Sequence, residues 1–408
     1  MRTRRAGIAA LLLVVGPGLL AGLSDDDPPG ITTYSILGAD HGYQLLWVLA
    51  ASTGALVVFH ELGARMGIVT GQGLIGLVRE RFGVRTTALA LTVLLLANIG
   101  TLCAQFAGIA AAASIVGVPR WVAVPLAAVM VSVLVLGGRF ARVEHVLLLM
   151  SSVFIAYIVA AVMARPDWGA AARGLVPSLS VDRSAAVVAT ATIGTTLAPW
   201  GLAFIQSYVA DKRLGIRDLR LERVDVIVGA LLTGIIGAFV VIACAATLYP
   251  AGVHINDARD AATALEPLAG SFAAGLFGIG LLGSGLLAVS ILPLSTAYSV
   301  TDAVGAEAAL NDRPRDARLF YVTFVAVVVV AAGVVCIPSV PLVPVLFLSQ
   351  VLNAVLLLPL IVLLRRLGRD RHLMGDHHLG PAGSVLTLLT IVFITAAVIL
   401  SFALEIVG

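Results

Sequence analysis

The 408-residue sequence has few charges, since Asp, Glu, Lys and Arg together make up only 12% of it. A soluble domain carries about 25% charged residues, so this scarcity excludes an ordinary soluble protein. Hydrophobic residues account for 60% of the chain, and the mean hydropathy is +1.04. The length suits about eleven or twelve membrane helices with short loops, which leaves no room for a large soluble domain.

Cysteine is scarce as well, and Cys103, Cys244 and Cys336 lie in separate apolar runs. Neither a disulfide framework nor a thiol metal cluster is therefore expected. The run 278–283 matches the dinucleotide fingerprint G-x-G-x-x-G, but it lies inside an apolar segment with no preceding strand. We expect no cofactor, no nucleic-acid partner and no enzyme activity. An intramembrane protease is disfavoured because no histidine in a later apolar segment would activate a serine.

Apolar segments of membrane-spanning length recur along the chain and predict an all-α polytopic membrane protein. They lie at 8–36, 43–65, 86–116, 120–138, 143–164, 184–211, 224–249, 268–300, 318–336, 340–364 and 383–407. With these eleven segments and a cytoplasmic N-terminus, the outer loops keep few of the 26 basic residues, namely Arg120, Arg165, Arg173, Arg183 and Arg259. This asymmetry follows the positive-inside rule. We expect a multi-pass protein surrounded by lipid in the cell inner (plasma) membrane.

Two of these segments are interrupted near their middle. Residues 24–30 read Ser-Asp-Asp-Asp-Pro-Pro-Gly before the first segment resumes at Ile31, and residues 198–201 read Ala-Pro-Trp-Gly in the sixth. Proline and glycine disfavour a continuous helix. One such break alone is a common proline kink. Two breaks at corresponding positions of inverted halves point to a transporter binding site.

The breaks divide the chain into repeats. Residues 1–165 form the first inverted repeat, 184–364 form the second, and 383–407 form an eleventh helix. Each repeat holds five helices, an odd number, so the two insert in opposite orientations. The first 23 residues also resemble a signal peptide. The repeat favours a membrane helix there, because removing the segment would delete half of a symmetric pair.

The first break offers carboxylate ligands to a cation. Asp27 directly precedes a proline, and a carboxylate at membrane depth marks function by default. Asp26 is a second candidate ligand. For Asp25 and Asp26 a solvated position nearer the surface is the alternative interpretation.

The remaining candidate donors are neutral. The second break offers backbone oxygens around Thr195 and Ala198, and Gln350 and Asn353 lie on one face of a predicted helix and can supply amide oxygens or hold waters. Hard cations such as Mg²⁺ prefer an all-oxygen set. Softer Mn²⁺ and Fe²⁺ sites commonly add nitrogen or sulfur.

A further polar group lies near the inner end of the second segment. His60, Glu61 and Arg65 are close together in the sequence. We interpret them as one interfacial charge network, with an inner gate contact as the alternative.

The ordered motifs resemble the Nramp family of divalent-metal transporters. That family carries Asp-Pro-Gly-Asn and then Gly-Tyr-x-Leu-Leu-Trp-Val, and here 27–30 precedes 42–48 at the family's spacing. Residues 79–82, 223–227 and 348–351 resemble its motifs after helix two, at the start of helix seven and in helix ten. The resemblance implies a LeuT-type fold with eleven helices, and divalent-cation transport.

The departures from the family pattern concern its ligands. Gly30 aligns with a metal-binding Asn, and Ala198 and Trp200 align with the Met and His of Met-Pro-His in helix six. Leu102 and Gln105 align with two helix-three acids linked to proton movement. This pattern resembles the branch of Nramp-related magnesium transporters, which carry a more hydrated ion without evident proton coupling.

These observations predict transport of Mg²⁺, with Mn²⁺ also accepted, without obligatory proton coupling and by a monomer. The predicted metal site comprises Asp26, Asp27, Gly30, Thr195, Ala198, Gln350 and Asn353. The alternative is a divergent proton-coupled Mn²⁺/Fe²⁺ transporter of the same family. A transporter of organic solutes such as amino acids is disfavoured, because three adjacent aspartates repel a carboxylate.

Overall fold

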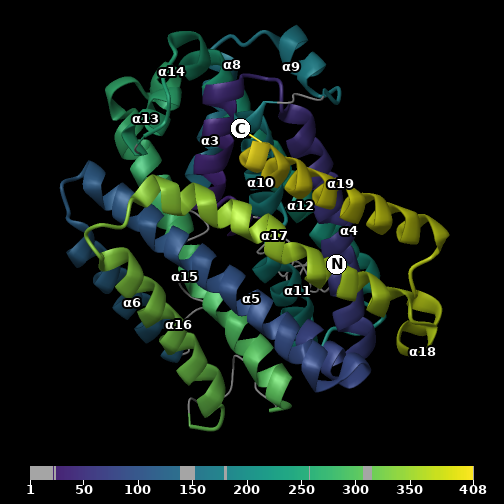
Figure 1. The fold of residues 1–408 in the computed structure, drawn as a ribbon. Helices are drawn as coiled ribbons and strands as arrows, with labels where there is room; N and C mark the ends of the chain where they lie inside the picture. The colour runs from purple at the N-terminus through teal and green to yellow at the C-terminus, as the bar shows by residue number, and fades with distance from the viewer. Residues whose placement is uncertain are drawn as a thin grey trace, which may run out of the picture.

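The computed structural model describes residues 22, 24–137, 152–178, 182–256, 258–306 and 315–407, which form helices joined by turns (Figure 1). The longer helices are α3 (Pro28–His41), α4 (Leu46–Thr70), α5 (Leu74–Ile115), α6 (Arg120–Leu136), α8 (Ala156–Met163), α10 (Arg183–Thr196), α11 (Pro199–Asp211), α12 (Leu219–Ala251), α15 (Ala273–Val304), α16 (Arg318–Cys336), α17 (Leu342–Arg369) and α19 (Pro381–Val407). The short helices are α9 (Trp168–Gly174), α13 (Ala258–Ala262), α14 (Glu266–Ala269) and α18 (Arg371–Met374).

Within the described ranges, eight helical segments are long and apolar enough to cross a membrane. They are Leu46–Thr70, Leu74–Ile115, Arg183–Asp211, Leu219–Ala251, Asp260–Val304, Arg318–Cys336, Leu342–Arg369 and Pro381–Ile406. Together with the shorter apolar helix α6, they coincide with nine of the eleven predicted segments. The other two, 8–36 and 143–164, lie partly outside the described residues. The prediction of an all-α polytopic membrane protein is confirmed.

One boundary differs clearly from its prediction. The helix expected at 86–116 begins at Leu74, and it contains a kink at Gly83, where φ is 79°. The charged run 79–81 hides this extension from a hydropathy window. This N-terminal extension is helical because its apolar side chains are buried against the rest of the protein. They are Leu74, Ile75, Leu77 and Val78.

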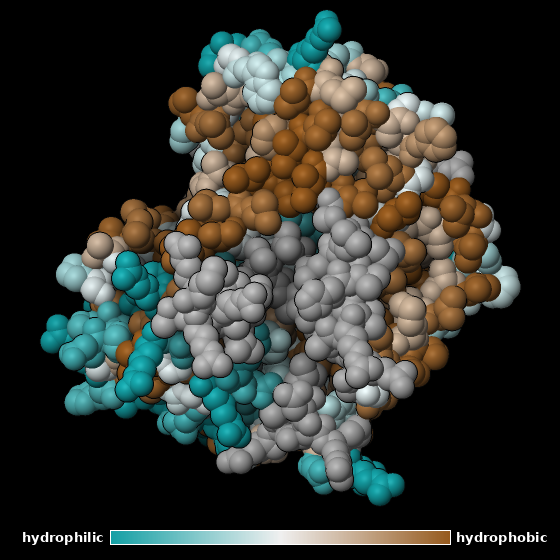
Figure 2. Space-filling model, turned by 180° about the vertical axis from the view of Figure 1, so that it is seen from behind, coloured by the Kyte–Doolittle hydropathy of each residue, from teal (hydrophilic) through white to brown (hydrophobic). Residues whose placement is uncertain are grey.

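The exterior of the helices is largely apolar. On α19, for example, Leu386, Leu389, Val392 and Ile399 are exposed. Figure 2 shows broad hydrophobic areas on the face seen there, with hydrophilic residues gathered mainly toward the top and the lower left. Such a surface suits lipid rather than water.

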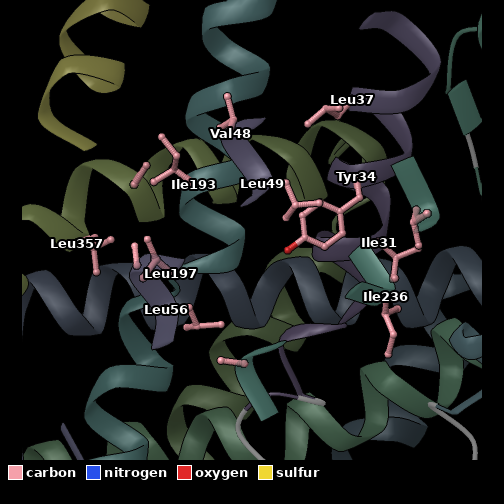
Figure 3. Close-up of a cluster of buried hydrophobic side chains, with 14 of the residues drawn as sticks. Ile31, Tyr34, Leu37, Val48, Leu49, Leu56, Ile193, Leu197, Ile236 and Leu357 are labelled. Carbon is pink, nitrogen blue, oxygen red and sulfur yellow. The ribbon is translucent and has the colours of Figure 1, made fainter. Parts of the chain in front are cut away.

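The core is built around α3, which packs against α12, α10, α17 and α5. Ile31, Tyr34 and Leu37 of α3 lie in a buried cluster with side chains of α4, α10, α12 and α17 (Figure 3). The Tyr34 hydroxyl lies 3.0 Å from Oγ1 of Thr196, the last residue of α10. The core therefore joins the first interrupted helix to the second.

Candidate metal site

The first interrupted helix restarts at Pro28, with Asp27 as its N-cap. We expected it to resume only at Ile31. Proline is favoured in the first turn, where its missing N–H would have no intrahelical partner, so the prolines start the helix. Asp27 Oδ1 accepts a hydrogen bond from the Gly30 N–H at 2.8 Å, and the Gln105 amide donates to Oδ2. Asp27 therefore has a structural role besides its possible role as a ligand.

Asp25 and Asp26 lie beside this cap and are also buried, each 2% exposed. Among the described residues, no group hydrogen-bonds to any of their carboxylate oxygens. The alternative of a solvated position is therefore wrong. Burying an unpaired carboxylate costs several kcal/mol, so these oxygens favour a nearby cation.

The second interruption carries no charged side chain. Helix α10 ends at Thr196, and α11 begins at Pro199 with Ala198 as N-cap. The proline again occupies the first helical position rather than the middle of the break. Ala198 is buried and makes no side-chain cap. This region therefore supplies backbone groups and space rather than charge.

Gly30 is the point where the two interruptions approach each other. A Cβ atom at Gly30 would lie 2.7 Å from the backbone oxygen of Asp25 and 3.3 Å from Oγ1 of Thr195. The first distance is shorter than the closest approach of a Cβ atom to a non-bonded atom in proteins, so this position has no room for a side chain. The structure thus brings Asp25, Asp27, Gly30 and Thr195 together.

The two amides of α17 belong to a polar network. Asn353 donates to Gln350 Oε1 at 3.1 Å and exchanges hydrogen bonds of 2.9 and 3.1 Å with the Thr101 hydroxyl. Thr101 lies one turn before Gln105, which contacts Asp27. The Gln350 amide oxygen therefore accepts from the Asn353 amide, and the Asn353 amide oxygen accepts from Thr101 on α5. Among the described residues, no hydrogen bond joins these two amides to the aspartates, and they reach only the helix that carries Gln105.

His60 lies apart from the ion pairs that we assigned to it. Glu61 pairs with Arg65 at 2.9 Å and with Arg223 at 2.8 Å. His60 is 1% exposed and faces the protein interior near Gly201. Its assignment to an interfacial network is therefore wrong. Adjacent helical residues point in directions about 100° apart, so His60 can face the interior while Glu61 faces the surface.

Within the described ranges, no group of three or more His, Cys, Asp or Glu side chains is placed to hold one metal ion. From the described part of the chain, a cation here would therefore take at most two such side chains, with hydroxyls, carbonyls and water completing its shell. Hydrated hard cations are held in this way.

Two cavities lie at opposite ends of α4. One, of about 520 Å³, is lined by residues including His41, Tyr43 and Arg173. The other, of about 830 Å³, is lined by residues including Gln72 and Asp302. His60 lies between these ends, since it is well inside α4, and Asp25 approaches it beside Gly201.

Comparison with known proteins identifies the family. The family model described as Nramp, natural resistance-associated macrophage protein-like, matches residues 18–404. The chain belongs to the Nramp family. The resemblance inferred from motifs is thereby confirmed at family level, as is the prediction that this chain is not an enzyme.

One relative within the Nramp family is the divalent metal cation transporter MntH of Burkholderia ambifaria, which is 31% identical over 281 residues. The alignment covers 66% of this chain and 64% of that protein, so it spans just under two thirds of the relative's length. MntH of Deinococcus radiodurans is 32% identical with the same coverage.

A solved structure shows the same fold. The manganese transporter of Eremococcus coleocola superposes with a TM-score of 0.76 at 22% identity, over 96% of this chain and 86% of that one. This likeness confirms the LeuT-type architecture expected of an Nramp protein.

Proposed function

We propose that this chain transports divalent metal cations across the membrane. The observation that supports this most directly is the pair Asp25 and Asp26, whose buried carboxylates have no partner among the described residues. They lie where two interrupted helices meet, and intramembrane acids of this kind mark ion pathways. An organic solute with a carboxylate would be repelled there. The relatives' names, divalent metal cation transporter and manganese transporter, point the same way.

Within this class we propose Mn²⁺ as the substrate, with Mg²⁺ as the second candidate. The sequence favours Mg²⁺, whereas the Eremococcus coleocola structure is named a manganese transporter, which favours Mn²⁺. Mg²⁺ is supported by Ala198 and Gly30, which provide no side-chain ligand and would leave the ion more of its water. This is the pattern that resembles the magnesium-transporting branch.

Transport without obligatory proton coupling is a further part of the proposal. Leu102 and Gln105 do not titrate, and both are buried on α5. Gln105 contacts Asp27 through its amide, where the family pattern has an acid. The proton-coupled alternative requires another group to carry the proton.

The proposed arrangement has residues 1–165 and 184–364 as inverted repeats and 383–407 as an eleventh helix. The N-terminus is cytoplasmic, and one copy suffices in the inner membrane. The cavities at the two ends of α4 are the proposed entry and exit sides.

Uptake into liposomes tests the proposal. Purified protein should carry Mn²⁺ inward, Mg²⁺ should compete, and the interior pH should not fall in proportion to metal uptake. Asp25→Asn and Asp26→Asn should each reduce uptake strongly, while Asp376→Asn, at an exposed position, should not. Wild-type uptake by both site variants would contradict the proposed site. Acidification that scales with metal entry would establish the proton-coupled alternative.

A further inference from the structure

His60 is a buried imidazole that lacks the partners such a group normally has. It lies on α4 and is 1% exposed, and its Nδ1 atom has no hydrogen-bond partner among the described residues. Most buried polar atoms in proteins are hydrogen-bonded. An imidazole that serves only to fill the core would ordinarily satisfy this requirement.

The imidazole and the Asp25 carboxylate approach the same point beside α11. A Cβ atom on Gly201 would lie 3.3 Å from His60 Nε2 and 3.8 Å from Asp25 Oδ1. The space that a side chain would occupy at Gly201 is therefore bordered by a nitrogen donor on one helix and an oxygen donor at the first interruption. Both Asp25 oxygens lack partners within the described residues.

We propose that Asp25 and His60 bind the transported ion together beside Gly201, and that His60 makes the site selective for transition metals over Mg²⁺. Two protein side chains, one carboxylate and one imidazole, would hold the ion, with waters completing its shell. This number agrees with the absence of any group of three metal-binding side chains in the described part of the chain. The inference rests on the proposed function and deepens it.

The chemistry of the donors sets the expected preference. Imidazole suits transition metals such as Fe²⁺ and Zn²⁺, and Mn²⁺ stands between these and Mg²⁺, which is bound by oxygen ligands and retained water. At the second interruption, Ala198 has no donor, and the Trp200 indole only donates a hydrogen bond and cannot bind a cation through its nitrogen. His60 thus supplies from α4 a nitrogen ligand that the sequence of the break lacks.

Pulsed electron paramagnetic resonance of the Mn²⁺-loaded protein tests the nitrogen ligand directly. The wild type should show coupling between Mn²⁺ and an imidazole ¹⁴N nucleus. His60→Gln should abolish the coupling and weaken Mn²⁺ uptake by at least about 10-fold, since the loss of even an outer-shell partner at a metal site costs on the order of 10- to 100-fold. Mg²⁺ uptake should be retained. The matched control is His254→Gln, since the His254 side chain is 75% exposed, and it should change neither signal.

Gly201→Ala gives an independent test if the His60 variant does not fold. Its methyl group would enter the space between the two donors, so the ¹⁴N coupling should disappear although both ligands remain. Wild-type coupling in either Gly201→Ala or His60→Gln would overturn the inference. Mn²⁺ transport by a wild type without ¹⁴N coupling would overturn the inference alone, whereas a wild type that carries no divalent cation would overturn the proposed function.

Discussion

The two interruptions lie close together but differ in what they contribute. The first places three carboxylates at the start of α3, of which Asp25 and Asp26 have no partner within the described residues. The second has Ala198 and Gly201 at the start of α11, with no charged side chain. One region supplies charge and the other supplies room. The comparison implies that removing a charge at the first break reduces metal uptake more than adding atoms at the second break does.

Removing the charge of Asp27 is the strongest test of the first region. Asp27→Asn should abolish divalent-cation uptake while leaving the fold intact. Asparagine caps a helix as well as aspartate does, so the Gly30 hydrogen bond is preserved. The Gln105 amide can turn to accept from the new side chain, because its Oε1 is unpartnered among the described residues. Uptake assays and melting temperature in detergent measure the two properties separately.

Asp27→Ala is the companion variant. It should lose uptake equally and also lose about 1 kcal/mol of stability with the cap. If Asp27→Asn transports normally, transport does not need a charge at this position. The idea that the first region contributes charge and the second contributes space then fails.

Adding a methyl group at the meeting point of the two regions should have the next largest effect. In Gly30→Ala, the Cβ would lie 2.7 Å from the backbone oxygen of Asp25, and backbone cannot move aside easily. Overpacking of this kind costs about 1–3 kcal/mol. We expect a lower melting temperature and reduced uptake. Gly54→Ala is the matched control, because nothing lies within 4 Å of its Cβ position. Equal melting temperatures for the two variants would show that the Gly30 position has room for a methyl group.

The two regions also differ in how far the sequence alone could describe them. The membrane helices were predictable because lipid requires long apolar segments whatever their packing. The breaks were visible from Pro and Gly, but their boundaries were not, since proline can end a helix or start one. The burial of Asp25 and Asp26 was undecided because depth in the membrane depends on tertiary packing.

His60 shows a different limit. In the sequence it adjoins Glu61, which forms surface ion pairs, and so it was grouped with them. The helix separates the two by about 100°, and only the structure shows which one faces inward. Its proximity to Gly201 comes from α4 packing on α11, a contact between segments distant in sequence.

A thioether at the second break should change selectivity more than stability. Ala198→Met adds a soft ligand and reduces the room for water, so preference should shift from Mg²⁺ toward Mn²⁺ and Cd²⁺. Competition between Mg²⁺ and Cd²⁺ for Mn²⁺ uptake measures the shift. Ala189→Met, on α10 away from the break, is the control. Unchanged competition in Ala198→Met would mean that the second region does not face the ion.

The smallest expected effect concerns the bond that joins the two regions. Tyr34→Phe removes the hydroxyl that lies 3.0 Å from Thr196 Oγ1. Thr196 keeps its hydrogen bond to the Thr192 carbonyl at 2.8 Å, so no orphaned donor remains there. Hydrogen bonds between membrane helices contribute about 0.6 kcal/mol on average, so the melting temperature should fall only slightly. Uptake should persist at a modestly lower rate, because the buried ring still packs between α3 and its neighbours. A loss of uptake as large as that of Asp27→Asn would show that the two regions act through this contact rather than through the ion.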